Sequence, residues 1–199
     1  MKNTAYIFPK ILKRQSLIVL CLMSCILCLS SACNNDDDNN TQDPLSQLPP
    51  MTTTGENTIG CLVNGEPFTD SGLMNNFYQF VDGESVLAIN WERGFTGNVR
   101  LGQIVLRNTQ INEEEIYILN KSNFLENDYT GGGALFFTDI EAEEGQYETN
   151  QNFTGQVYFT RFDDENNIMS GTFSFEAQEI FTGETITITD GRFDLTFTN

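Results

Sequence analysis

The chain has 199 residues, of which 28 are acidic and ten are basic, so its formal net charge is −18 at pH 7. Such an acidic protein repels nucleic acid and anionic lipid headgroups, and we expect neither as a partner. The complete lack of histidine excludes the imidazole-based serine and cysteine triads, the usual zinc ligand sets and the commonest general base at neutral pH.

The first 32 residues have the three parts of an export signal. A basic segment ends at Arg14, the apolar run "SLIVLCLMSCILCL" follows, and the small residues "SSA" close it. The apolar run has about 14 residues, whereas a membrane-spanning helix needs roughly 20. A retained single-span anchor is the alternative, but the sequence that follows lacks the positive charges typical of a stop-transfer segment. We therefore predict a signal peptide over residues 1–32.

Cys33 directly follows these small residues, in "LSSAC". This stretch resembles the lipobox of bacterial lipoproteins, although Ser30 stands where a larger apolar residue is commoner. The resemblance implies that Cys33 is acylated and becomes the mature amino terminus, so the membrane would be contacted through lipid alone. The mature chain would keep 28 acidic residues against six basic ones, a net charge of about −22. Cys61 would be its only other cysteine, which leaves no intramolecular disulfide.

Residues 33–57 contain few apolar side chains, three prolines and the run Asp36-Asp37-Asp38. This composition predicts a disordered acidic linker with an end-to-end distance on the order of 25–30 Å. The acidic run also resembles the export tag that sends some Bacteroidota lipoproteins to the outer cell surface, and a merely solvating spacer is the alternative. We expect an outer-membrane protein exposed at the cell surface, with the periplasmic face as the alternative.

Residues 58–199 have the composition of one globular domain with strand-like patterns. Hairpin turns are predicted at Asn64-Gly65, Asp82-Gly83 and Asp190-Gly191, each between alternating apolar and polar residues. "GQVYFTRF" and "GTFSFEA" predict paired strands across the loop 163–167, and "IYIL" predicts a strand over 116–119. We predict an all-β domain, an antiparallel β-sandwich or barrel of about nine to ten strands, and these patterns do not separate the two.

Two stretches of this domain carry a family resemblance. "TGENTIGCLVNGEPF" (54–68) and "SGTFSFEAQEIFTGETITITDGRFDLTF" (170–197) resemble a family of Bacteroidota lipoproteins of unknown function. Domains of that family open with a Gly-Cys-x-Val-Asn-Gly motif and end with a "GRFDL"-like strand. Between them, residues 71–156 match only in the spacing of the predicted strands. The resemblance implies the fold class and the location, and it brings no activity, cofactor or catalytic residue.

Aromatic residues are the first candidates for a binding site. Tyr129 stands beside the glycine run 131–133, which allows close backbone approach, and is the favoured ligand-binding residue. Trp91, Tyr78 and Tyr147 could join it in a stacking platform for sugar rings. The alternative for Trp91 is a core position, because it alternates with other apolar residues of its strand.

Acidic clusters are the candidates for a Ca²⁺ site, the one cofactor considered. Asp163, Asp164, Glu165 and Asn167 lie in a predicted hairpin loop and mix carboxylates with an amide. A solvated turn is the alternative, since the loop lacks the alternating ligand spacing of a dedicated calcium loop. The acidic runs 113–115 and 141–144 are weaker candidates.

We predict no catalytic residue. The sequence has 28 acidic residues, so no particular acid–base pair can be chosen among them, and no nucleophile motif occurs. Cys61 is expected to be a buried structural residue of an alternating strand. The favoured function is a non-catalytic extracellular module that binds a glycan or small molecule. An envelope component that docks a basic protein partner is the alternative, and a carboxylate-based hydrolase ranks third.

Overall fold

The computed structural model describes residues 43–70, 74–93, 100–122, 130–139 and 144–199. These residues form eleven strands and one short 3-10 helix. Within the described ranges no helix has the length and apolar content needed to cross a membrane. In chain order the elements are η1 (Pro44–Gln47), β1 (Thr58–Val63), β2 (Glu66–Asp70), β3 (Phe77–Val81), β4 (Glu84–Arg93), β5 (Arg100–Arg107), β6 (Glu115–Lys121), β7 (Gly131–Asp139), β8 (Glu144–Glu148), β9 (Gly155–Asp163), β10 (Ile168–Glu179) and β11 (Thr185–Thr196).

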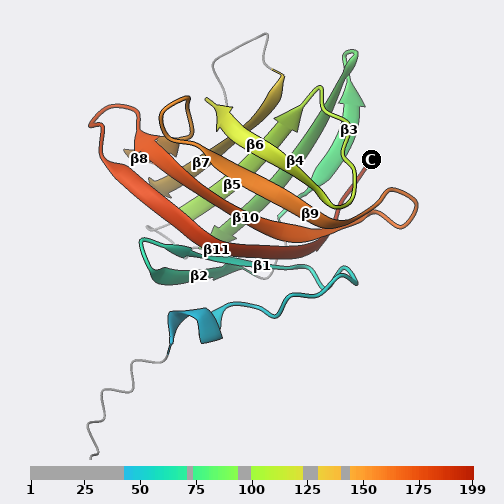
Figure 1. Cartoon of the computed structure of the whole chain (residues 1–199), viewed down its shortest axis with the longest axis horizontal. Helices are drawn as coiled ribbons and strands as arrows, with labels where there is room; N and C mark the ends of the chain where they lie inside the picture. Colours follow the sequence, from blue (N-terminus) through green and yellow to red (C-terminus); the bar gives the residue numbers. More distant parts are fainter. Residues whose placement is uncertain (1–42, 71–73, 94–99, 123–129, 140–143) are drawn as a thin grey trace, which may run out of the picture. The chain divides into compact units, whose positions relative to one another are not determined.

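Five of the strands close into a barrel. β10 pairs with β9, β9 with β6, β6 with β7, β7 with β8, and β8 returns to β10. The β6–β7 pair is parallel and the others are antiparallel, so the barrel is mixed. The sheet continues from β10 into β11, β1 and β2, and from β7 into β5, β4 and β3. Figure 1 shows β9, β10 and β11 crossing in front of β4, β5 and β7. The all-β prediction is confirmed, in the form of a barrel.

The hairpins predicted at Asn64-Gly65 and Asp82-Gly83 are confirmed. Both residues of each turn have positive φ, 50° and 85° in the first and 54° and 93° in the second, as a two-residue type I′ turn requires. These turns join β1 to β2 and β3 to β4. The predicted pairing of β9 with β10 across the loop 163–167 and the predicted strand β6 are confirmed as well.

The hairpin predicted at Asp190-Gly191 is wrong, because both residues lie within the continuous strand β11. Gly191 pairs with Phe173 and Ile188 pairs with Phe175, so two residues of β11 lie opposite one residue of β10, and the one extra residue forms a bulge. Asp190 has a φ of 54°. A left-handed residue next to glycine is typical of both a tight turn and a bulge. Here β11 pairs with β10 and β1 on both sides of Asp190, so the chain continues as one strand and the conformation forms a bulge.

The core lies between the inward faces of these strands. The predicted inward residues of β4 and β10 are almost completely buried, and so is Cys61. Burial raises the pKa of the Cys61 thiol to about 12, so this cysteine stays protonated and acts as a small apolar side chain. The inward residues that confirm the predicted alternation are Leu87, Ile89, Trp91, Phe173, Phe175, Ala177, Ile186, Ile188, Phe193, Leu195 and Phe197.

The predicted linker ends too late in the sequence, because residues 43–57 pack on the barrel. We call this segment the N-terminal arm. Leu48 of the arm is buried. The side-chain oxygen of Asn57 accepts hydrogen bonds from both the backbone nitrogen and the hydroxyl of Thr196. Gly60 of β1 lies so close to Pro49 that an added Cβ would approach a ring carbon to 2.6 Å. The folded unit therefore includes residues 43–57 of the expected linker, 33–57.

Asp194 of β11 fixes the arm at its other end. Its buried carboxylate accepts hydrogen bonds from the backbone nitrogens of Thr54, Gly55 and Glu56 at 3.0, 2.8 and 3.2 Å. The Ser170 hydroxyl donates a fourth at 2.7 Å. Burial opposes ionisation of Asp194, but the hydrogen bonds outweigh it and hold the pKa of this carboxyl below its usual value. The "FDL" and "TGEN" motifs, 140 residues apart in sequence, thus form one clasp.

Candidate functional site

The predicted aromatic platform does not form from the residues that the structure describes. Trp91 is fully buried with its ring centroid 5.0 Å from that of Phe173, and Tyr147 is 9% exposed within the core. Tyr78 is half-buried and packs edge-on against Phe162. These three residues serve the core because each lies on the inward side of its strand. Tyr129 lies outside the described residues.

The loop predicted to bind Ca²⁺ is a hydrogen-bonded turn. The Asp163 carboxylate accepts from the backbone and side-chain nitrogens of Asn166, both at 2.9 Å, and from the Arg161 guanidinium at 2.6 Å. Chiefly through the Asn166 bonds, the pKa of Asp163 falls to about 2. Asp164 and Glu165 are exposed, and the Asn167 side chain accepts a hydrogen bond from Asn199.

No group of three or more carboxylate or thiol ligands among the described residues could share a metal ion. This geometry gives no support to the prediction that Asp163, Asp164, Glu165 and Asn167 bind Ca²⁺, since three local donors already contact the Asp163 carboxylate. In the run 113–115, Glu113 and Glu115 likewise accept hydrogen bonds from neighbouring protein groups. Residues 141–143 of the run 141–144 lie outside what the structure places, as does Cys33.

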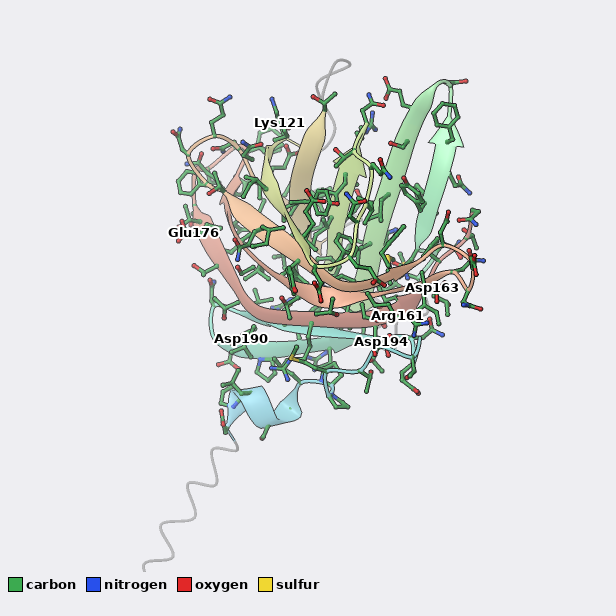
Figure 2. The ribbon with its side chains drawn as sticks, turned by 45° about the vertical axis from the view of Figure 1, so that its right-hand side comes forward. Lys121, Arg161, Asp163, Glu176, Asp190 and Asp194 are labelled. Carbon is green, nitrogen blue, oxygen red and sulfur yellow. The ribbon has the colours of Figure 1, made fainter. Side chains whose placement is uncertain are left out.

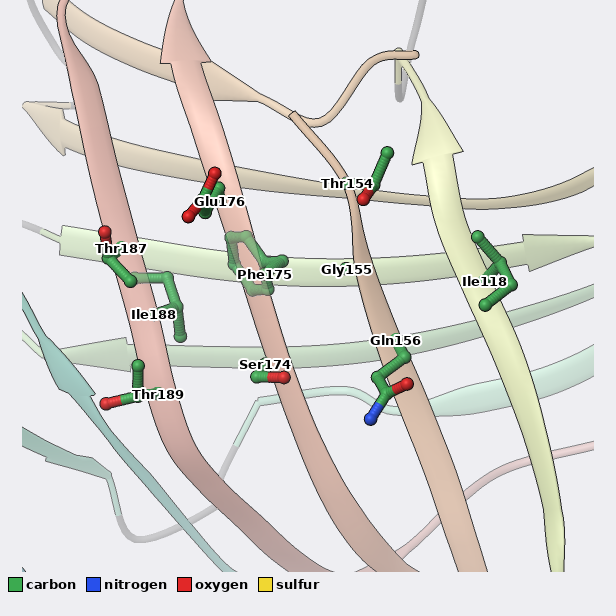
Figure 3. Close-up of a pocket in the computed structure, with 10 residues that line it drawn as sticks. All are labelled: Ile118, Thr154, Gly155, Gln156, Ser174, Phe175, Glu176, Thr187, Ile188 and Thr189. Atoms are coloured by element: carbon green, nitrogen blue, oxygen red, sulfur yellow. The ribbon is translucent and has the colours of Figure 1, made fainter. Parts of the chain in front are cut away.

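A groove of about 520 Å³ lies on the outer face of β6, β9, β10 and β11 (Figure 3). Strand alternation creates its lining: Phe175 and Ile188 point into the core beneath it, and their neighbours along the strands point outward. We call it the outer groove. Its outward-facing side chains are Ile118, Thr154, Gln156, Ser174, Glu176, Thr187 and Thr189.

The outer groove continues into a second hollow of about 280 Å³. Gln156 and Ser174 line both hollows, so they form the junction between a first and a second section. The second section follows β10 to Thr172 and is bordered by residues 190–192 of β11 and by Met51 of the arm. From Glu176 to Thr172 the groove follows four residues of an extended strand, about 13 Å. A ligand that filled both sections would be elongated along β10.

The polar side chains of the outer groove are not used inside the protein. Among the described residues, no hydrogen bond or ion pair involves the side chains of the four hydroxyl residues, of Gln156 or of Glu176 in the first section. Buried polar side chains elsewhere behave differently: Asn90, for example, donates to Asn75 at 2.7 Å and accepts from Gln103 at 2.6 Å. The groove thus presents a row of hydrogen-bonding groups to whatever enters it.

An apolar surface lies beside this polar row. Ile118 is 53% exposed at the edge of the groove, and Ile116 is 52% exposed on the same outward face of β6. Gly155 of β9 faces Phe175, and a Cβ there would come within 2.2 Å of the Phe175 Cβ. The missing side chain lets the phenyl ring pack directly beneath the groove.

A second pocket, of about 460 Å³, lies at the end of β8 and β10. Its two buried carboxylates are already satisfied: Glu148 accepts from Ser122 and Gln146, and Glu179 accepts from the backbone nitrogens of residues 181 and 182. Backbone hydrogen bonding from Thr182 lowers the pKa of Glu179. These groups hold a turn in place, so this pocket is a weaker candidate for ligand binding.

The outer groove was missed at the level of sequence, although its residues alternate with core positions that were predicted. The strand "TITIT" contributes Thr187 and Thr189 to it, and "TFSFE" contributes Ser174 and Glu176. Alternation indicates that these side chains face outward, but only the curvature of four neighbouring strands makes that face concave. Comparison of the chain with protein-family models, with curated proteins and with solved structures gave no match.

Proposed function

We propose that the protein is a non-catalytic module that binds a linear, neutral glycan in the outer groove. The observation that carries this proposal is the row of unused hydroxyl and amide groups over β9, β10 and β11. Hydroxyl groups both donate and accept hydrogen bonds, as sugar hydroxyls do, so the two surfaces can pair without a net charge. The exposed Ile118 side chain supplies an apolar contact for the carbon-bound face of a sugar ring.

The acidic groups of the groove favour binding over hydrolysis. Glu176 is the one carboxylate of the first section. Asp190 lines the second section and not the first. Glycoside hydrolysis uses two carboxylates that face each other at about 5–9.5 Å across the bond to be cleaved. The groove lacks such a facing pair within one section.

The location belongs to the same proposal. A signal peptide over residues 1–32 and acylation of Cys33 would anchor the protein in the outer membrane by lipid, with the barrel exposed at the cell surface. The sequence "LSSAC" supports this, together with the acidic run that follows it. Metabolic labelling with a clickable fatty acid should label the wild-type protein and leave Cys33→Ala unlabelled. Equal labelling of the two would contradict the anchor.

A second candidate function is docking of a basic protein, which the exposed Ile116 and Ile118 pair favours. These two aliphatic side chains form a small apolar patch on β6, and the unused Glu176 carboxylate lies two strands away, across the groove from Ile118. In that case co-purification of the partner should weaken at high salt, because exposed charges are screened. Glycan binding through neutral groups should be insensitive to salt.

The test is calorimetric titration with neutral unbranched oligosaccharides, chosen from a glycan array. Gln156→Ala and Thr187→Val each remove hydrogen bonds from the groove, and each should weaken binding by about three- to tenfold. Thr185→Val is the matched control, since Thr185 faces outward on the same strand but does not line the groove. Absence of binding to any glycan, or equal losses in Thr185→Val and Thr187→Val, would refute the proposal.

A further inference from the structure

The second section of the outer groove is built partly by the N-terminal arm. Met51 borders it with a side chain that is 63% exposed. The arm is held there by contacts on both sides of Met51: Arg192 donates to the Pro49 carbonyl at 3.4 Å, and Arg161 donates to the Thr53 carbonyl at 2.5 Å. A flexible, exposed methionine on a fixed backbone is an adaptable apolar contact.

Polar side chains also border the second section. The Arg192 Nε donates to the Asp190 carbonyl at 3.5 Å, which orients the guanidinium along β11. Its Nη2 group makes no hydrogen bond within the described part of the chain. The hydroxyl of Thr172 and the exposed carboxylate of Asp190 are likewise unused there. The second section therefore combines one apolar contact with several hydrogen-bonding groups, like the first.

We propose that the second section is a separate subsite for the same ligand, with Met51 of the arm as one wall. This inference rests on the proposed glycan-binding function. A linear oligosaccharide would pass over Gln156 and Ser174, which border both sections, and place its further units against Met51, Thr172 and Arg192. The segment that leads toward the predicted membrane anchor would thus take part in recognition, and affinity would grow with ligand length.

The experiment is calorimetric titration of the full chain with unbranched manno-, xylo- and cello-oligosaccharides, from disaccharide to octasaccharide. Long oligomers should bind about tenfold more tightly than short ones. Met51→Ala should remove about fivefold of this gain and leave the affinity for short oligomers unchanged. Leu45→Ala is the matched control, because Leu45 is an exposed apolar residue of the arm outside the groove. It should bind all lengths like wild type.

Four outcomes would contradict the subsite, the ligand class or the proposed function. A gain with length that Met51→Ala leaves intact would show that the arm takes no part, and equal losses for short and long oligomers would show that Met51 acts on the first section. Tight binding of an extended peptide of similar length, in competition with the oligosaccharide, would overturn the ligand class. If neither short nor long oligomers bind, the proposed function is wrong, and the subsite proposal is wrong with it.

Discussion

Asp194 and Glu176 are carboxylates on the paired strands β11 and β10, but their surroundings differ (Figure 2). Asp194 is 1% exposed and accepts four hydrogen bonds, three of them from the arm. Glu176 is exposed, and no group in the described protein bonds to its carboxylate. A buried polar side chain bonded to protein partners maintains the fold. A group of exposed polar side chains without protein partners, on a concave face, is available for a ligand.

The largest effect expected from this comparison is the loss of the clasp. Asp194→Ala would leave the backbone nitrogens of residues 54–56 and the Ser170 hydroxyl without their acceptor. We expect the free energy of unfolding to fall by about 3–4 kcal/mol. Urea denaturation followed by tryptophan fluorescence would measure it, because Trp91 is the single tryptophan and is buried. Glu176→Ala, the matched control, should change the stability by less than about 0.5 kcal/mol; similar losses in the two variants would contradict the comparison.

A somewhat smaller effect is expected beneath the groove. Gly155→Ala would place a Cβ 2.2 Å from the Phe175 Cβ and 2.4 Å from the Ser174 carbonyl oxygen, both in the neighbouring strand. The strands must separate to relieve the overlap, at a cost of about 2–3 kcal/mol. Thermal unfolding should report a lower midpoint. An unchanged midpoint would mean that β9 and β10 can separate at Gly155 without a cost in stability.

Acid should weaken the clasp. The lowered pKa of Asp194 means that the folded state favours the ionised carboxyl. Its contribution is therefore fully present above the unfolded-state pKa, about 3.9, and is lost as the pH falls through the lower folded-state value. The stability difference between wild type and Asp194→Asn should be constant from pH 7 to about pH 5 and shrink below about pH 4. A difference that grew on acidification would contradict the lowered pKa.

The smallest effect is expected from the threonines of β11. Thr185→Val and Thr187→Val each replace an exposed hydroxyl by a methyl group in a strand that favours branched side chains, so stability should change by less than about 0.5 kcal/mol. The two variants should differ in ligand binding alone, with Thr187→Val affected. Destabilisation of Thr187→Val by about 1 kcal/mol or more would mean that the Thr187 hydroxyl maintains the fold and is not free for a ligand.

Local patterns in the sequence predicted the parts of the fold that depend on neighbouring residues. Alternation indicated the inward faces of β4 and β10, and the residues Asn64-Gly65 indicated their turn, because both signals act within a few positions. The Asp190-Gly191 bulge was misread as a turn, since the same backbone conformation serves both. The predicted core alternative for Trp91 is right, and it rested on alternation rather than on residue type.

Features that depend on contacts far apart in sequence could not be predicted in this way. Residues 43–57 have the composition of a linker, and their order depends on Asp194 and Arg161, more than 100 residues away. The outer groove depends on the curvature of four strands, which no single strand encodes. The calcium prediction for Asp163 counted carboxylates and did not consider the local donors of Asn166, which hold this carboxylate in a turn.

The most direct test of the account is nuclear magnetic resonance of the labelled protein during titration with a neutral linear oligosaccharide. The account predicts that the backbone amide signals of Gln156, Ser174 and Thr187 shift progressively, together with that of Met51 when the oligomer is long. The amide signals of Asp194 and of the residues around Glu148 should not shift. Shifts confined to that pocket, or none with any oligosaccharide, would contradict the claim that the outer groove is a binding site.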